Sequence, residues 1–259
     1  MNTSTEQRNN PRNYSFSELR KICQHTSSNP AQEGFTGKVV RFFSIYITFA
    51  FLHTSISPNA ITILSVFVFF SGMGTFFFGE HSLNILGGLL LIFSVLLDAS
   101  DGEVARFRKT AGRLGSNYVE PVSHDIQYGI SFIMLGAALA LTSGDQLFFL
   151  LGGVASVATL LFRLFESRFW QYYHAGITKN DVEEIKQGYS SLPFYARLAS
   201  WFRRRWYSST GFALLTFLAA CADKLEYILW FWAVGMCLFT AMLALKQFGR
   251  LYRESKAIE

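Results

Sequence analysis

Six long apolar segments, separated by short polar connections, constrain this chain more than any other feature of its sequence. They lie at about 60–78, 84–106, 117–142, 147–171, 208–222 and 227–247. A helix needs about 20 predominantly apolar residues to cross the hydrocarbon core of a bilayer. Charged residues make up only 16% of the 259 residues, against about 25% in an average soluble domain. We therefore expect an all-α polytopic membrane protein with six transmembrane helices.

The distribution of basic residues predicts how these helices are oriented. The connections at 79–82, 143–146 and 222–226 contain a single Lys or Arg, Lys224. The other connections and the C-terminal tail are rich in Lys and Arg, including the run at 203–205. Because basic loops stay on the cytosolic side, both termini are expected in the cytosol, which agrees with an even number of spans.

The N-terminal part of the chain differs from the rest in composition. Its first 30 residues are polar and contain no apolar core, so we expect no signal peptide and a cytosolic N-terminus. Residues 1–14 are expected to be disordered, and residues 15–26 to form a short helix. The segment 38–53 is apolar but short, which favours a helix lying in the membrane interface, with a seventh span as the alternative.

These features predict three regions. Residues 1–37 form a polar cytosolic segment, residues 38–250 a membrane domain of six helices preceded by the interfacial helix, and residues 251–259 a cytosolic tail. The net charge of +5 gathers at the ends of apolar runs, which indicates anionic lipid rather than nucleic acid as the partner. The loop 172–207 mixes aromatic and basic residues, which is typical of an interfacial segment.

The end of the second span carries two carboxylates. On a helix, Asp98, Asp101, Gly102 and Ala105 share one face, and Arg106 follows. Charged groups inside spans are costly, so each one is a functional candidate. Two carboxylates one turn apart repel each other unless a cation joins them, and Mg²⁺ is bound by carboxylates together with substrate phosphates. The small residues leave room for a ligand against the backbone.

The third span begins with a polar stripe at helical spacing, which consists of Asn117, Glu120, His124, Gln127 and Ser131. Since the spans are otherwise apolar, this stripe is expected to face the interior of the bundle. The simplest assembly is a metal site of Asp98, Asp101 and Glu120, open to the cytosol, with His124 one turn deeper. The alternative is that these groups only tie two helices together.

Six of these positions carry a family resemblance. Asp98, Asp101-Gly102, Ala105-Arg106 and Gly115 match in identity and spacing the signature of the CDP-alcohol phosphotransferase (CDP-alcohol phosphatidyltransferase) family. The segment Ser57-Pro58-Asn59-Ala60-Ile61-Thr62 also resembles the start of that family's first span. The last two Asp positions of the signature fall on Val119 and Ser123, and a shift by one residue places Glu120 and His124 there.

The resemblance implies an activity and a set of roles. The expected reaction moves a substituted phosphate from a CDP-linked donor, CDP-diacylglycerol or a CDP-alcohol, to a hydroxyl acceptor and releases CMP. Asp98, Asp101 and Glu120 would hold Mg²⁺ or Mn²⁺, and His124 would be the base. Asp125 is its rival, as a further ligand or as the partner that orients His124. The residues expected at the donor are Asn59, Gly102, Ala105, Arg106 and Gly115. A homodimer is the family's expected assembly.

Other interpretations stay open at this point. Arg163 and Arg168 in the fourth span are candidates for binding a phosphate, and Arg168 could equally reach the membrane surface. Acids and His inside spans also mark ion pathways, so a transporter is the competing class of protein. A catalytically degenerate relative or a structural scaffold are the remaining alternatives.

Overall fold

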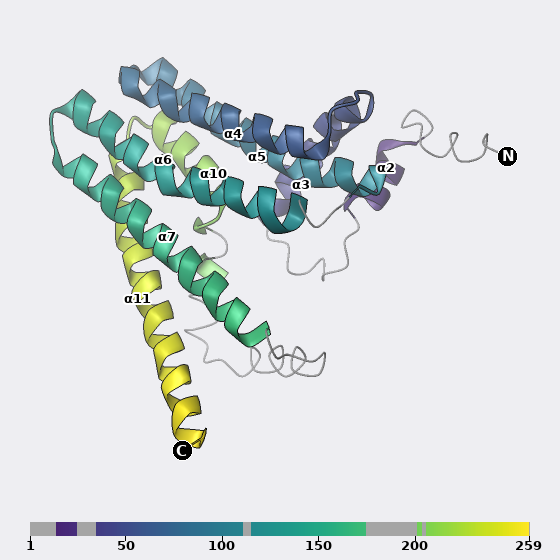
Figure 1. Ribbon diagram of the computed structural model, residues 1–259. Helices are drawn as coiled ribbons and strands as arrows, with labels where there is room; N and C mark the ends of the chain where they lie inside the picture. Colours follow the sequence, from purple (N-terminus) through teal and green to yellow (C-terminus); the bar gives the residue numbers. More distant parts are fainter. Residues whose placement is uncertain (1–13, 25–34, 111–114, 175–200, 204–205, 259) are drawn as a thin grey trace. The chain divides into compact units, whose positions relative to one another are not determined.

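The computed structural model of the chain describes residues 14–24, 35–110, 115–174, 201–203 and 206–258 (Figure 1). All regular secondary structure in these residues is helical, which confirms the predicted all-α class. The chain divides into two compact units, residues 1–127 with 208–223 and residues 128–207 with 224–259. Each unit is described by itself.

The first unit holds both N-terminal helices and the polar ends of two predicted spans. Its elements are α2 (Phe16–Gln24), α3 (Phe35–Leu52), α4 (Pro58–Thr75), η3 (Phe76–Phe78), α5 (His81–Arg108), η4 (Gly115–Val119), the first turns of α6 (Glu120–Ser143) and α10 (Ser209–Cys221). The second unit contains the rest of α6, α7 (Leu147–His174) and α11 (Leu225–Ile258). In the first unit, α5 packs against α3, α4 and α10.

Each of the six predicted spans contains a helix at the expected place. Five helices are long and apolar enough to cross a membrane: α4 with η3, α5, α6, α7 and α11. Helix α10 has 13 residues, fewer than the roughly 17 that a perpendicular span requires. These helices make the chain an integral membrane protein. Helix α2 lies within the short helix predicted at 15–26, while the disorder predicted for 1–14 and most of the interfacial loop fall outside the described residues.

Local sequence explains where α4 begins. Ser57 is extended, and its hydroxyl accepts a hydrogen bond from the Ala60 amide at 3.3 Å. Pro58 occupies the first turn, where its missing amide hydrogen has no intrahelical partner to lose. Helix α4 therefore starts at the Ser-Pro-Asn break that the sequence predicts.

Glycines let α5 pack closely against two of its neighbours, α4 and α10. A Cβ at Gly72 of α4 would meet the Gly87 carbonyl oxygen of α5 at 2.9 Å, and a Cβ at Gly88 would meet Phe217 Cα of α10 at 2.7 Å. Small residues let helix backbones approach closely where apolar side chains alone give little driving force in lipid. These contacts set the position of α5, which carries both aspartates.

Helix α5 ends in a residue with left-handed backbone geometry. Lys109 has φ 54°, its amide donates to the Arg106 carbonyl, and the Thr110 amide donates to the Ala105 carbonyl, which is a Schellman arrangement. Left-handed geometry costs a residue with a Cβ roughly 1–2 kcal/mol. Glycine relieves this cost, but it also gives the unfolded chain more conformational freedom, which offsets part of the gain. We therefore expect Lys109→Gly to stabilise the protein by about 1 kcal/mol.

Thermal unfolding in detergent measures this effect. A gain of about 1 kcal/mol corresponds to a rise in Tm of about 2–4 °C for a domain of this size. Lys109→Ala is the matched control, because it removes the same charge and keeps the Cβ. Equal Tm changes in the two variants would mean that charge, not backbone geometry, is responsible.

Helices α7 and α11 lie side by side in the second unit (Figure 1). Thr240 Oγ1 of α11 donates to the Ala158 carbonyl of α7 at 2.8 Å. Tyr207 precedes α10 in sequence and packs on α11, where its ring stacks on Phe231 and its hydroxyl donates to the Phe231 carbonyl at 2.8 Å. Burial raises the pKa of Tyr207 to about 12, so it remains a neutral donor at physiological pH.

Candidate active site

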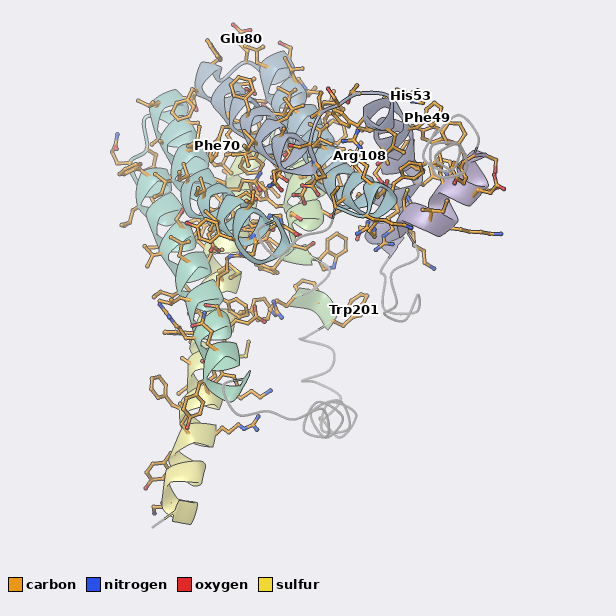
Figure 2. The ribbon with its side chains drawn as sticks, turned by 45° about the vertical axis from the view of Figure 1, so that its right-hand side comes forward. Phe49, His53, Phe70, Glu80, Arg108 and Trp201 are labelled. Carbon is orange, nitrogen blue, oxygen red and sulfur yellow. The ribbon has the colours of Figure 1, made fainter. Side chains whose placement is uncertain are left out.

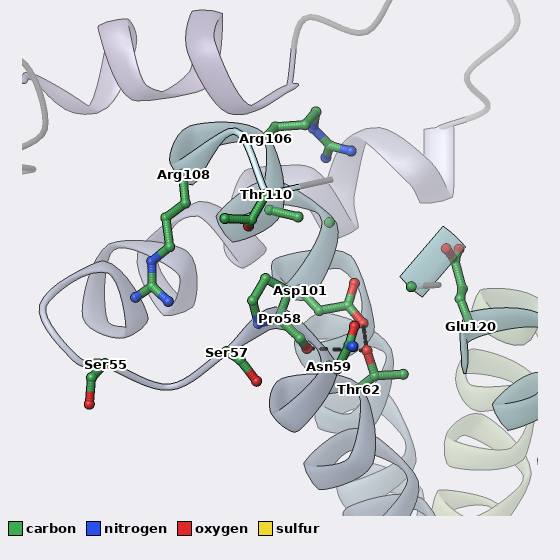
Figure 3. Close-up of a pocket in the computed structure, with 13 residues that line it drawn as sticks. Ser55, Ser57, Pro58, Asn59, Thr62, Asp101, Arg106, Arg108, Thr110 and Glu120 are labelled. Carbon is green, nitrogen blue, oxygen red and sulfur yellow. Dashed lines mark hydrogen bonds between the residues drawn. The ribbon is translucent and has the colours of Figure 1, made fainter. Parts of the chain in front are cut away.

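A cavity of about 500 Å³ lies in the first unit, at the end of α5 and the start of α4 (Figure 3). That volume is within the range of about 300–1,000 Å³ that is usual for small-molecule sites. Its lining consists of Ser55, Ser57, Pro58, Asn59, Thr62, Asp101, Gly102, Ala105, Arg106, Arg108, Thr110, Gly115 and Glu120. All five residues predicted at the donor are in this set, together with two of the three predicted metal ligands.

Asp101 is held in place from α4. Thr62 Oγ1 donates a short hydrogen bond to Asp101 Oδ2, and it also lies 3.2 Å from the Pro58 carbonyl oxygen (Figure 3). Both Thr62 and Asp101 are buried. Thr62 is the last residue of the segment Ser57-Pro58-Asn59-Ala60-Ile61-Thr62, and no role was predicted for it. Its spacing of four from Pro58, facing an aspartate on the next span, is the signal that could have identified it.

Asp98 and His124 face each other across α5 and α6. His124 Nε2 lies 3.7 Å from Asp98 Oδ2, and both side chains are mostly buried, with exposed fractions of 20% and 24%. This pair would be an ion pair when the imidazole is protonated. Asp98 therefore stands beside the imidazole, and the role expected of Asp125 at His124 stays a prediction.

Glu120 lies on the opposite side of the cavity from Asp101 (Figure 3). It is close enough to Asp98 and Asp101 for the three carboxylates to repel one another. Among the described residues, no three His, Cys, Asp or Glu side chains converge tightly enough to enclose an ion. The donor set nevertheless fits a hard divalent cation in its chemistry, because all three side chains offer only carboxylate oxygens.

A π-helical turn lies between the matched glycine and the first shifted acid. It is η4, Gly115–Val119, and α6 begins at the next residue, Glu120. A π turn closes through i→i+5 hydrogen bonds, so it accommodates one more residue than an α-helical turn. The one-residue shift from Val119 and Ser123 to Glu120 and His124 coincides with this turn. A Cβ on Gly115 would meet Asn59 Oδ1 at 3.1 Å, so this turn also lies close to the start of α4.

Arg108 supports the segment that leads into the cavity. Its guanidinium donates to the carbonyls of Phe51 at 2.9 Å and Thr54 at 2.6 Å, and to that of Ile56. These carbonyls belong to the end of α3 and to the connection before α4. Figure 2 labels Arg108 together with His53, which follows α3. Nothing local in the sequence indicates this role, because the three acceptors lie more than 50 positions away.

The two arginines predicted to bind phosphate belong to the second unit. The Arg163 guanidinium lies over the Tyr128 ring at 5.4 Å from its centroid. Arg168 Nη1 donates to Gln171 Oε1 at 3.0 Å on an exposed face of α7. Their roles, and those of the other site residues, remain predictions.

Fold and cavity together describe an integral membrane protein with a cavity lined in part by carboxylates. The sequence model of the CDP-alcohol phosphatidyltransferase family matches residues 55–234, well over half of the chain. The chain belongs to this family of transferases, which move a phosphate-linked group from a CDP-alcohol to an acceptor and generally depend on a divalent metal. No curated protein matches the chain.

Proposed function

We propose that this protein transfers a substituted phosphate from a CDP-linked donor, CDP-diacylglycerol or a CDP-linked alcohol, to a hydroxyl acceptor and releases CMP. Phospholipid or related phosphodiester synthesis is the pathway class. The proposal rests on the lining of the cavity. It contains all five residues predicted at the donor, Asn59, Gly102, Ala105, Arg106 and Gly115, together with the carboxylates of Asp101 and Glu120.

The cavity wall suits a nucleotide diphosphate. Gly102 and Gly115 carry no side chain, which lets the Arg106 guanidinium and the Asn59 amide lie close to the backbone: a Cβ would meet Arg106 Nη1 at 3.2 Å and Asn59 Oδ1 at 3.1 Å. Arg106 is a cation at the same wall, and guanidinium groups pair well with phosphate. Asn59 offers a side-chain amide at the start of α4, where the helix dipole also favours an anion.

In the proposed step, His124 takes the proton of the acceptor hydroxyl. The hydroxyl oxygen then forms a bond to the phosphorus distal to cytidine, and the bond from that phosphorus to the CMP oxygen breaks. Asp98 at 3.7 Å holds the imidazole and stabilises its protonated form. In this scheme Asp125 helps to orient the His124 side chain. Catalysis would consist mainly of positioning and charge stabilisation, as in phosphoryl transfer generally.

The metal in this proposal is Mg²⁺ or Mn²⁺, held by Asp98, Asp101 and Glu120. When bound, it would neutralise the diphosphate charge of the donor. Thr62 orients one of these ligands, since its hydroxyl bonds to Asp101. Arg163 and Arg168 are proposed to bind a phosphate of the donor or acceptor.

The proposed orientation of the chain in the membrane, and its division into three regions, follow the charge pattern of the sequence. We place the site and both termini in the cytosol, with residues 1–37 and 251–259 flanking a membrane domain at 38–250. Helix α3 lies in the membrane interface in this arrangement. A homodimer is the proposed assembly.

Metal-dependent CMP release by the purified protein tests the proposal. We expect release from at least one CDP-linked donor in a panel of lipid and small-alcohol conjugates, loss of release with EDTA, and recovery with Mg²⁺ or Mn²⁺. Calcium is a useful comparison, because it favours more ligands and longer bonds than Mg²⁺. Folded protein that binds neither CDP nor a divalent cation would contradict the proposal.

A further inference from the structure

A buried carboxylate on α5 ties this helix to both N-terminal helices. Glu103 is 1% exposed, and it follows directly after Asp101 and Gly102. Its Oε1 accepts hydrogen bonds from Ser44 Oγ at 2.6 Å and Gln24 Nε2 at 2.9 Å, and its Oε2 accepts one from Thr48 Oγ1 at 2.6 Å. Both oxygens are satisfied by donors from α2 and α3, which is what a buried carboxylate requires.

Helix α2 is attached by polar contacts at its last residue and by an apolar face. Gln24 Nε2 also donates to the Arg41 carbonyl at 2.7 Å, and Arg41 Nη1 donates to the Gln24 carbonyl at 2.8 Å. Leu19 and Cys23 are fully buried in a cluster that includes Val104 of α5. Both kinds of contact involve α5 or its neighbour α3, so α2 has a defined place on this unit.

The end of α2 directly contacts a residue of the cavity. Arg106 Nε donates to the Cys23 carbonyl, at a helix end where carbonyl groups lack intrahelical partners and carry partial negative charge. The same guanidinium lies across Gly102, since a Cβ there would meet Arg106 Nη1 at 3.2 Å. Arg106 and Gly102 both line the cavity. The direction of the Arg106 side chain is therefore set by the Cys23 carbonyl at the end of α2.

We infer that α2 is a bracket that positions Arg106 at the donor cavity, with Glu103 and Gln24 as its positioning residues. The bracket consists of α2 and the contacts of Glu103, Gln24 and Arg106 described above. Helix α2 lies outside the region that the family model matches, which begins at residue 55, whereas Glu103 and Arg106 lie inside it. The role in donor binding rests on the proposed function, whereas the bracket itself is a property of the fold.

A double-mutant cycle tests whether α2 acts through Arg106. Gln24→Ala and Arg106→Ala are made singly and together in the full chain, and KM for the donor and kcat of CMP release are measured. Gln24→Ala is expected to raise KM about tenfold and to change kcat by less than about twofold. In the Arg106→Ala background the same substitution is expected to change KM little, because the side chain that it positions is absent.

The matched control is Lys21→Ala, an exposed position on the same helix that touches neither Glu103 nor Arg106 in the described contacts. It is expected to leave KM unchanged. An equal rise in KM from Gln24→Ala in both backgrounds would overturn the inference, because α2 would then act by general stabilisation.

A second readout needs no activity. Cys23 is fully buried, and burial raises its pKa to about 11, so its thiol should react slowly with a water-soluble maleimide. Mass spectrometry of the Cys23 peptide follows its labelling separately from Cys221 and Cys237. Glu103→Ala is expected to speed this labelling at least about tenfold by releasing α2, and the isosteric Glu103→Gln to have a smaller effect.

The two readouts separate the possible failures. Faster labelling of Cys23 in Glu103→Ala, in protein that releases no CMP from any donor, would support the bracket and count against the proposed function. Labelling that stays as slow in Glu103→Ala as in the unmodified chain would overturn the bracket, whatever the activity.

Discussion

Asp101→Asn is expected to reduce CMP release by at least about 10²–10³-fold, the size of effect seen when one preorganised electrostatic contact is removed from an active site. The substitution keeps the shape of the side chain and its acceptor oxygen for Thr62, so α4 and α5 should stay together. It removes one negative charge from three carboxylates, those of Asp98, Asp101 and Glu120, that lie close enough to repel one another. Affinity for the divalent cation should fall in parallel with turnover.

Two measurements on the purified variant check this result: steady-state CMP release, and metal binding by calorimetry. The matched control is Asp223→Asn, because Asp223 is an exposed aspartate of the same unit whose side chain is 76% exposed. Its left-handed backbone also tolerates asparagine. Full activity in Asp101→Asn with unchanged metal affinity would remove this residue from the metal site, and its hydrogen bond with Thr62 would then be structural.

His124→Gln is expected to lower kcat by about 10²–10⁴-fold, the usual contribution of a general base. The physical reason is that glutamine keeps a hydrogen-bonding side chain near Asp98 but cannot take a proton from the acceptor hydroxyl. KM for the donor should change little, because His124 does not line the cavity that gathers the donor residues. The split between kcat and KM therefore separates a base from a binding residue.

His81→Gln supplies the control for the same chemical change at a half-exposed histidine. Asp125→Asn decides between the two residues that the sequence left as rivals. A large loss of kcat in Asp125→Asn, with near-normal turnover in His124→Gln, would transfer the role of base to Asp125. Similar moderate losses in both variants would indicate that neither accepts the proton alone.

The helices could be predicted from sequence because they depend on local properties. Apolar runs interrupted by Ser57-Pro58, Gly79 and Gly144 give a helix in every predicted segment, with ends displaced by a few residues. The largest difference is at the C-terminus, where α11 continues to Ile258, beyond the end of the span predicted at 227–247. That polar extension contains mainly good helix formers, so it can continue the helix beyond the apolar run.

The acidic face of α5 was also accessible from sequence, since helical spacing alone places Asp98, Asp101, Gly102 and Ala105 together. The register of the next acids was less secure. The signature's spacing from Gly115 falls on Val119 and Ser123, whereas the polar stripe of the third span favours Glu120 and His124. The π turn of η4 lies where this one-residue shift occurs. Such a turn depends on packing around the backbone, which residue spacing does not reveal.

The contacts that place these side chains were decided by tertiary structure. Thr62 meets Asp101 across 39 positions, Gln24 meets Glu103 across 79, and Arg106 meets the Cys23 carbonyl across 83. By itself, the sequence determined which segments are helical and which polar groups the membrane helices carry, because apolar length and residue spacing act locally. Which donor satisfies which buried acceptor depends on how distant helices pack, and only the folded chain determines that.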